Sequence, residues 1–272
     1  MKISVVTAYY NRHDLFIKTL ESISKTQYKG DFEIIAVDDV SKDSQRITDL
    51  PSLFPKLNLK IVRIDEKDKW WVNPCIPNNI GFGIASGDII IIQNPECLHV
   101  GDVISHAAKN ISNNKYIVFG CYGIDTTKTQ LISKIDGGSV EEVYKIISPI
   151  CNASLYSWTI KNRWYQHSKF SAYGLNYCTA ITREDLKDLG GFDEAYANGI
   201  SYDDTDFFRR VCRKGMNIDM VDDPLVVHQC HEFTDYGNKK LVDLNTNLFK
   251  ATANIKTFRV FNKHAEMYKK WL

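Results

Sequence analysis

The chain has 272 residues, of which 44% are hydrophobic and 25% are charged, and its formal net charge is +1 at pH 7. These values are typical of a folded, water-soluble protein and exclude an intrinsically disordered or collagen-like chain. The near-neutral charge also argues against a general basic surface for nucleic acid, so we expect no nucleic-acid partner.

The lengths of the apolar runs and the spacing of the cysteines indicate in which cellular compartment the protein works. The longest aliphatic run, residues 89–92, is far shorter than the roughly 20 residues that cross a bilayer. The first residues lead directly into Tyr9-Tyr10-Asn11-Arg12 and lack the long apolar segment of a signal peptide. The seven cysteines include no Cys-x-x-Cys pair, which is typical of free thiols in a reducing compartment. We therefore expect a cytoplasmic protein.

Four apolar segments in the first hundred residues have the composition of buried strands. They span residues 2–8, 32–37, 57–64 and 88–92. A helix with Leu15, Phe16, Leu20 and Ile23 on one face is predicted after the first of them. This alternation predicts an α/β fold in which helices cover both faces of a mostly parallel sheet. In such sheets ligands bind beyond the carboxyl ends of the strands.

The second half is less regular. Strands are predicted over residues 116–121 and 177–182, a polar loop or hairpin over 124–138, and helices over 139–147, 183–189 and 203–214. Gly190-Gly191 suits the end of the second helix. We find no repeat and no linker, and predict one domain over residues 1–231 with a basic helical extension over residues 232–272.

Four ordered motifs resemble those of the family 2 glycosyltransferases, which have the GT-A fold. They are residues 3–12 (ISVVTAYYNR), residues 35–41 (IAVDDVS), residues 78–88 running into 93–96, and residues 190–194 followed by 202–206. The resemblance covers residues 1–231. It implies inverting transfer of a sugar from a nucleotide-sugar donor, with a UDP-sugar expected, to a hydroxyl of a glycan or other acceptor.

The resemblance also implies a nucleotide site. Its members would be Ala8, Tyr10, Asn11, Asp39, Asn79 and Asn94. The chemistry agrees, because an aromatic ring such as Tyr10 can stack on a base and the Asp39 carboxylate can accept a base N–H. A polar turn after a strand would also explain the residues around Asp39. Asn78 stands where many members carry a basic residue, so Lys69, Arg183 or a metal would meet the phosphate charge.

The family's Asp-x-Asp metal motif aligns with Asn94-Pro95-Glu96. Glu96 can still ligate Mn²⁺ or Mg²⁺, but Asn94 is neutral, so the site carries one negative charge fewer. The family adds a late histidine, for which we predict His228 rather than His231. Alternatives are a zinc site built from His228, Cys230 and His231, a simple strand-end turn, and a packed core histidine.

The acids that open the predicted helix over 203–214 provide the candidate general base. By the resemblance Asp204 removes the proton of the acceptor hydroxyl, and Asp203 orients the acceptor. Further acceptor-binding candidates are Asp193, Trp164 and the pair Trp70-Trp71, since exposed aromatic rings stack on sugars. The helix dipole alone would also favour acids at a helix start, and tryptophans commonly pack in cores.

The last segment, residues 239–272, carries eight Lys or Arg against Asp243 and Glu266. It would either pack on the catalytic domain with a solvated cationic face, or contact an anionic membrane surface, a polyanionic acceptor or a second copy. Asn94 leaves a second function open, a catalytically inactive module that binds nucleotide-sugars or glycans. A nucleotidyltransferase is disfavoured because Tyr9-Tyr10-Asn11-Arg12 is no glycine-rich phosphate loop.

Overall fold

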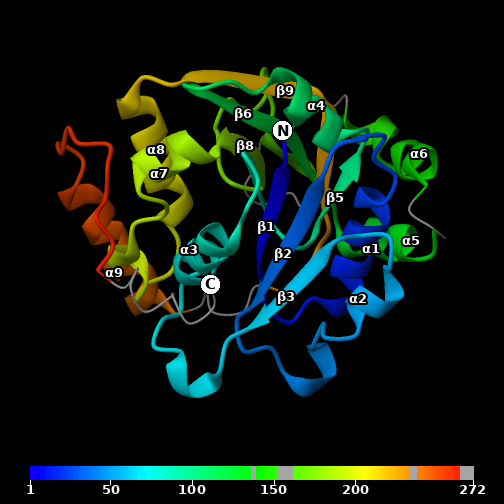
Figure 1. Cartoon of the computed structure of the whole chain (residues 1–272), viewed down its shortest axis with the longest axis horizontal. Helices are drawn as coiled ribbons and strands as arrows, with labels where there is room; N and C mark the ends of the chain where they lie inside the picture. The colour runs from blue at the N-terminus through cyan, green and yellow to red at the C-terminus, as the bar shows by residue number, and fades with distance from the viewer. Residues whose placement is uncertain (136–138, 152–161, 233–237, 264–272) are drawn as a thin grey trace.

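The computed structural model describes residues 1–135, 139–151, 162–232 and 238–263, which form one twisted sheet flanked by helices (Figure 1). The strands are β1 (Ile3–Tyr9), β2 (Phe32–Asp38), β3 (Leu59–Arg63), β4 (Ile89–Gln93), β5 (Cys97–Val100), β6 (Lys115–Gly123), β7 (Arg163–Gln166), β8 (Cys178–Thr182) and β9 (Asn217–His228). The helices are α1 (His13–Ile23), α2 (Leu50–Leu53), α3 (Cys75–Ile84), α4 (Val103–Asn110), α5 (Thr126–Ser133), α6 (Val140–Cys151), α7 (Arg183–Leu189), α8 (Asp203–Lys214) and α9 (Lys239–Ala251).

The first half of the sheet is parallel. The strand order is β3-β2-β1-β4-β8-β6-β9-β5, with β7 paired to β6, and β1 to β4 all run in one direction. Helices α1 and α3 connect these strands, of which β1, β2 and β4 are largely buried and rich in Val and Ile. The four strands predicted from apolar runs are confirmed within a few residues at each end.

The second half of the sheet differs from the predicted one in the direction of its strands. β8 pairs antiparallel with β4 and with β6, β5 pairs antiparallel with β9, and only β6 and β9 are parallel to each other. The described sheet is therefore mixed rather than mostly parallel. Strand direction depends on long-range pairing that a local apolar pattern does not encode. The α/β prediction itself is confirmed.

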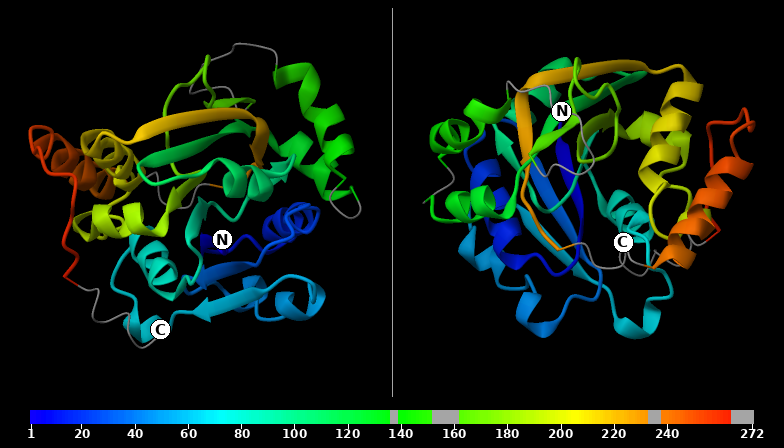
Figure 2. Two further views of the ribbon diagram at one scale, coloured as in Figure 1. Left: turned by 45° about the horizontal axis from the view of Figure 1, so that its top comes forward. Right: turned by 180° about the vertical axis from the view of Figure 1, so that it is seen from behind.

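Helices cover both faces of the sheet (Figure 2). One face packs against α1 and α4 through a cluster that includes Phe16, Leu20 and Ile104. The other packs against α3, α7 and α8 through a cluster that includes Ile80, Leu186 and Phe207. The helices α7 and α8 begin and end where the sequence predicted, and left-handed Gly190 (φ +83°) ends α7 as expected.

The prediction of a polar loop or hairpin over residues 124–138 is wrong, because residues 126–133 form α5. Asp125 caps this helix by accepting the backbone N–H of Lys128 at 2.8 Å. Only Thr129 and Ile132 of α5 are buried, so the helix lacks the broad apolar face that sequence patterns detect. With α6 it covers a third apolar cluster beside β5 and β7.

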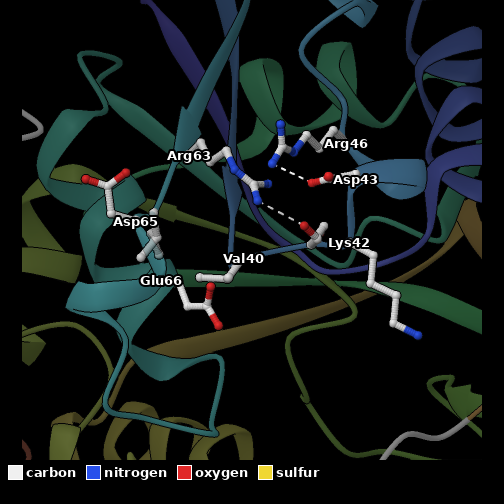
Figure 3. Close-up of a pocket in the computed structure, with 9 residues that line it drawn as sticks. Val40, Lys42, Asp43, Arg46, Arg63, Asp65 and Glu66 are labelled. Atoms are coloured by element: carbon white, nitrogen blue, oxygen red, sulfur yellow. Dashed lines mark hydrogen bonds and ion pairs between the residues drawn. The ribbon is translucent and has the colours of Figure 1, made fainter.

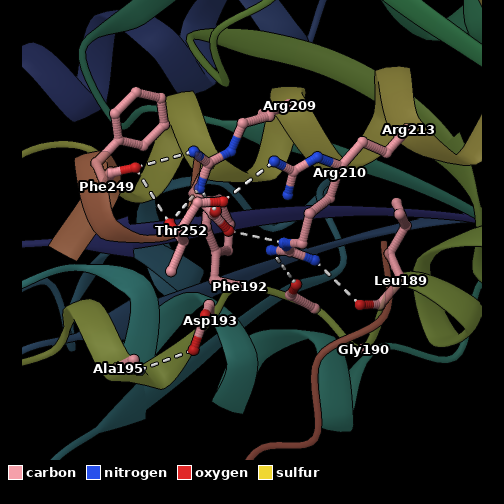
Figure 4. A network of polar contacts seen from close by, with 12 residues as sticks. Leu189, Gly190, Phe192, Asp193, Ala195, Arg209, Arg210, Arg213, Phe249 and Thr252 are labelled. Atoms are coloured by element: carbon pink, nitrogen blue, oxygen red, sulfur yellow. Dashed lines mark hydrogen bonds and ion pairs between the residues drawn. The ribbon is translucent and has the colours of Figure 1, made fainter. Parts of the chain in front are cut away.

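The C-terminal extension packs on the catalytic domain through α9 and residues 252–263. Asn245 of α9 is fully buried and donates Nδ2 to the carbonyls of Tyr196 (3.0 Å) and Ser201 (2.8 Å). Arg209 of α8 donates to the Phe249 carbonyl at 3.0 Å, and its guanidinium lies over the Phe249 ring (Figure 4). Lys239 and Lys250 stay exposed, so α9 has the solvated cationic face expected of a docked helix. The proposed domain boundary near residue 231 stays a prediction.

Two further expectations concern cysteines and membrane spans. Four cysteines are buried, Cys230 is half-buried, Cys212 is exposed, and all six are free. Within the described ranges, no helix combines the length and the apolar content needed to cross a bilayer. The side chain of Cys151 lies outside the described residues.

Candidate active site

The candidate site lies where the carboxyl ends of β1, β2 and β4 meet the end of β9 and the start of α8. Arg12, after β1, donates Nη1 to Oε2 of Glu96, after β4, at 2.7 Å. Asn11 accepts the backbone N–H of Lys42, after β2, at 2.9 Å and donates its own N–H to Ser41 at 3.0 Å. The loops therefore hold one another in place, as expected for ligand sites of α/β sheets.

A pocket of about 450 Å³ opens beside the end of β2. It is lined by Tyr10, Val40, Glu66, Lys69, Trp70 and Trp71. The Lys69 ammonium lies 5.0 Å from the centroid of the Tyr10 ring, and 37% of Tyr10 is exposed. Aromatic faces beside a cation suit a planar base that carries phosphate. The structure thus brings Tyr10 and the tryptophan pair to one pocket.

Asp39 lies behind this pocket rather than on its open side. Its Oδ1 accepts the Trp71 indole N–H at 2.9 Å, and its Oδ2 accepts Lys69 Nζ at 2.9 Å. Burial raises the pKa of Asp39 to about 6, although these two donors oppose the rise. Each carboxylate oxygen retains a second acceptor position, so Asp39 can both fix Trp71 and Lys69 and accept a ligand N–H.

A second pocket, of about 430 Å³, adjoins the first across Val40 and Glu66 (Figure 3). Arg63 stands in it, donating to the Asp38 carboxylate at 2.5 Å and to the Ser41 carbonyl at 3.0 Å. Val40 between the pockets has φ +63°, a left-handed conformation that a β-branched residue rarely adopts. Strain of this kind concentrates at ligand-binding loops, so Val40 marks this corner as a candidate ligand site.

A potential metal site forms around Glu96. One ligand atom each from Glu96, His228 and His231 lies within 4.8 Å of the others, with Glu96 Oε1 at 3.0 Å from His228 Nε2 and 3.3 Å from His231 Nε2. Burial would raise the pKa of Glu96, but Arg12 and the two imidazoles hold it well below its usual range. Burial lowers the pKa of His228 despite the Glu96 carboxylate. A carboxylate and a neutral imidazole are the forms that bind a divalent cation.

The chemistry of this donor set fits the expected metal, with one competitor. Glu96 is 1% exposed, so an ion there would be screened from water. Arg12 already occupies Oε2 of Glu96, and Asn94 Nδ2 lies 3.5 Å from Oε1. The zinc alternative is not supported, because Cys230 Sγ lies 3.4 Å from Thr126 Oγ1 and is outside the described cluster of potential ligands.

The three acids that open α8 lie in different surroundings. Asp206 is buried between Arg209 Nη2 (2.6 Å) and Arg210 Nε (2.7 Å). Asp203 is 6% exposed and accepts Asn73 Nδ2 at 3.0 Å. Asp204 is half-buried and forms no ion pair within the part of the chain that the structure describes. Asp204 is therefore the acid of the three that combines access with a carboxyl group outside the described ion pairs.

Two influences make Asp204 an unusually strong carboxylate base. Burial, reinforced by the charge of Asp203, raises the pKa of Asp204 to about 8. A hydrogen bond from Asn176 Nδ2 at 3.3 Å opposes this rise. A pKa near the working pH is the optimum for a general base.

Other predicted site residues are engaged in the fold. Asn79 is clamped to the Phe192 backbone, with its Nδ2 donating at 3.0 Å and its Oδ1 accepting at 2.9 Å. Trp164 is 5% exposed and packs against Tyr122 and His167. Half-buried Asp193 caps a short turn by accepting the Ala195 N–H at 2.9 Å. Ala8 is half-buried near the end of β1 and Asn94 is half-buried beside Glu96.

Sequence reasoning did not identify two groups that the structure places at the site. Arg12 was part of a motif without a role, and Asn176 was not noted. Asn176 comes directly before the predicted strand 177–182, at its active-site end. Asn176 lies at the site only because β8 runs antiparallel to β4, so the rule for carboxyl ends of parallel strands could not have found it.

The chain matches the model of the family described as "Glycosyltransferase like family 2" over residues 4–265. The amylovoran biosynthesis glycosyltransferase AmsB of Erwinia amylovora is 26% identical over 87% of this chain and 71% of its own length. The poly(ribitol-phosphate) beta-glucosyltransferase of Bacillus spizizenii is 38% identical over 35% of this chain, but only 15% of its length is covered.

Solved structures give the same fold. TarS residues 1–349 from S. aureus, in complex with UDP-GlcNAc, superimposes with a TM-score of 0.59 at 17% identity, over 98% of this chain and 70% of that one. The mannosyltransferase PcManGT from Pyrobaculum calidifontis, in complex with GDP-Man and Mn²⁺, gives 0.53 at 15% identity, over 99% and 82%. The chain therefore has a GT-A fold and belongs to the glycosyltransferase-like family 2.

Proposed function

We propose that this chain is an inverting glycosyltransferase that transfers a sugar from a UDP-sugar to a hydroxyl of a glycan or similar acceptor. The observation that carries the proposal is Asp204, a half-buried carboxyl group at the start of α8 that lies outside the described ion pairs and whose pKa is raised to about 8. In the reaction the acceptor hydroxyl gives its proton to Asp204 while its oxygen bonds to the anomeric carbon. The bond from that carbon to the diphosphate breaks, and its electron pair leaves with the nucleoside diphosphate.

For the donor, we place the nucleoside in the pocket of Tyr10, Lys69 and Trp70, behind which buried Trp71 holds Asp39. The aromatic faces would hold the base, Asp39 would accept a base N–H, and Lys69 would face the phosphates. The UDP and UDP-GlcNAc complexes of TarS and the GDP-Man complex of PcManGT support a nucleotide-sugar as the donor. Of the predicted nucleotide residues, Asn11 would act through the loops that it joins, and buried Asn79 would act by holding α3 to the Phe192 backbone.

We infer that a divalent cation, Mn²⁺ or Mg²⁺, binds at Glu96, His228 and His231. Two imidazoles beside one carboxylate favour Mn²⁺ over Mg²⁺, which prefers oxygen ligands. When bound, the cation would neutralise charge on the leaving diphosphate. Arg12 holds a positive charge at the same carboxylate and would share that role.

For the acceptor, we infer a position over Asp204. Half-buried Asp193 remains a candidate contact, and Asp203, 6% exposed, would support the acceptor site from behind Asp204. Trp164 is 5% exposed and packs in the apolar cluster covered by α5 and α6, so we assign it no acceptor contact. A cytoplasmic location and a membrane contact of the basic extension stay predictions.

The proposal is tested by binding and turnover together. Calorimetry should show that UDP binds, and that Mn²⁺ tightens the binding in the wild type but not in Glu96→Gln. A panel of UDP-sugars and GDP-sugars at pH 8.5, where more of Asp204 is ionised than at pH 7, should then reveal slow donor hydrolysis for a UDP-sugar. Glu232→Gln is the matched control. It changes an acid that follows His231 in sequence but is not part of the cluster, and it should bind UDP and Mn²⁺ as the wild type does. UDP binding with no turnover of any donor would instead support the inactive binding module.

A further inference from the structure

The buried side chain of Asn176 connects Asp204 to the central sheet. Asn176 is 3% exposed and donates Nδ2 to Oδ1 of Asp204 at 3.3 Å. Its own Oδ1 accepts two hydroxyls, Tyr116 of β6 at 2.6 Å and Thr179 of β8 at 3.2 Å. The amide thus spans from two strands of the sheet to the first turn of α8.

We propose that Asn176 is a positioning residue for Asp204, held by Tyr116 and Thr179 so that its amide N–H always faces the carboxylate. This inference rests on the proposed function, in which Asp204 is the general base. Asn176 would fix the direction of the Asp204 carboxylate and stabilise its ionised form, and would not itself touch the substrate.

The orientation of the amide follows from the inventory of donors and acceptors. A hydroxyl can donate one hydrogen, and an amide oxygen can accept two. With Tyr116 and Thr179 both donating to Oδ1, the amide NH₂ is left facing Asp204. A flipped amide would place its oxygen against the ionised Asp204 carboxylate and lose the hydrogen bond of 3.3 Å there, whereas in the observed orientation all three contacts are hydrogen bonds.

Other charged and titratable groups around Asp204 do not replace this donor. Asp203 on the same helix is a second acid and raises the pKa of Asp204. Burial raises the pKa of the Tyr116 phenol and of the Cys75 thiol near Asp203, so both keep their protons. Asp206 is already paired with Arg209 and Arg210. Among the described residues, the Asn176 amide is the group recorded as donating to the Asp204 side chain.

The test is the pH dependence of kcat/KM for transfer or donor hydrolysis between pH 6.5 and 10, since this profile reports the pKa of an essential base in the free enzyme. Asn176→Ala removes a hydrogen bond to a charged group, so the acidic limb should move alkaline by about one to two pH units. Activity should fall about 10- to 100-fold at pH 7 and by much less at pH 9.5. Tyr116→Phe leaves Thr179 as a donor to Asn176 and should give a smaller shift in the same direction.

Controls separate positioning from simple loss of structure. Asn110→Ala, a matched change on α4 whose amide bonds only the His106 carbonyl of its own helix, should leave the profile unchanged. The affinity for UDP should be unchanged in Asn176→Ala, which shows that the variant is folded. In an Asp204→Asn background, Asn176→Ala should cause no further loss, because residues that act as one unit are not additive.

The outcomes distinguish this inference from the proposed function. If Asp204→Asn retains activity, the base assignment fails whatever Asn176 does. If Asp204→Asn is inactive but the acidic limb of Asn176→Ala stays at the wild-type pH, the role of Asn176 is overturned while the proposed function stands. An equal loss at every pH with weakened UDP binding would also overturn it, because that pattern indicates a structural role.

Discussion

Two acids at opposite ends of the sheet, Glu33 and Asp204, have opposite surroundings. At the amino ends of the strands, Glu33 is fully buried and accepts Ser4 Oγ (2.7 Å), Ser86 N and Oγ (2.8 and 2.6 Å) and Lys60 Nζ (2.6 Å). At the carboxyl ends, Asp204 is half-buried with one long hydrogen bond, from Asn176 at 3.3 Å.

The pKa values follow from this difference in donors. Burial taken alone would raise the pKa of Glu33, Asp204 and Asp39 alike. At Glu33 the donors outweigh burial and lower the pKa to about 2. At Asp204 burial and the charge of Asp203 prevail and raise it to about 8, and at Asp39 burial raises it to about 6. Glu33 at the amino ends thus contributes to stability, whereas Asp204 and Asp39 at the carboxyl ends stay reactive at the cost of stability. Glu96 is the exception at the carboxyl ends, because Arg12 and two imidazoles hold its pKa low.

The largest effect is expected at Asp204. Asp204→Asn should reduce transfer about 10²- to 10⁴-fold, the usual contribution of a general base. It should also raise the Tm at pH 9. The folded pKa lies above the unfolded value, so the stabilisation associated with this group is present at low pH and is lost as pH rises through about 8. An uncharged Asn has no such loss. Thermal unfolding at pH 5 and pH 9, beside an activity assay, measures both effects.

Asp206→Asn is the matched control on the same helix. It removes the partner of Arg209 and Arg210, so it should lower the Tm at both pH values. If Asp204→Asn instead destabilises the protein at pH 9 as Asp206→Asn does, Asp204 is a structural acid and the contrast between the two ends of the sheet fails.

The next largest effect is expected at the other end of the sheet. Glu33→Gln should lower the free energy of unfolding by about 2 kcal/mol at pH 7, because a buried charge-assisted network loses its charge. The folded pKa of Glu33 lies below the unfolded value, so its contribution is present above about pH 4.5 and is lost as pH falls towards 2. Urea unfolding of the wild type and Glu33→Gln at pH 7 and pH 3 tests this, because the difference between their free energies of unfolding should be smaller at pH 3.

Activity is the control for Glu33. Turnover per folded molecule should match the wild type, since Glu33 lies at the opposite end of the strands from Asp204. A lowered kcat with unchanged stability would contradict the division of roles between the two ends.

Local patterns were sufficient to predict the elements that carry the chemistry. The apolar runs of β1, β2 and β4 and the helical spacing in α7 and α8 depend on neighbours in sequence, and those elements occur as predicted. The placement of polar residues after strand ends also brought Glu96 and His228 together, because parallel strands share one carboxyl edge.

Contacts between distant segments could not be predicted in the same way. The Asn73–Asp203 and Asn176–Asp204 hydrogen bonds join different elements, and no periodicity encodes such pairs. The same limit applies to burial. Trp164 and Asn79 have residue types that suit ligand sites, yet packing against β6 and the Phe192 backbone leaves them buried. A residue type indicates what a side chain can do, and the tertiary fold decides whether it is accessible.

The smallest effect is expected at Asp39, which is intermediate between the two ends. Asp39→Asn keeps an oxygen that can accept the Trp71 indole N–H but loses the charge that holds Lys69. Binding of uridine, which lacks a phosphate that titrates near pH 6, should weaken about fivefold to tenfold at pH 7.5 through the loss of one ligand hydrogen bond. In the wild type, affinity should rise between pH 5 and 7 as Asp39 ionises, and in Asp39→Asn it should stay flat. Calorimetry across this range measures both. Identical affinities and pH profiles for the wild type and Asp39→Asn would mean that the uracil ring binds elsewhere, and the adjoining pocket around Arg63 would be the next site to test. Asp39 would then have a structural role, as Glu33 does.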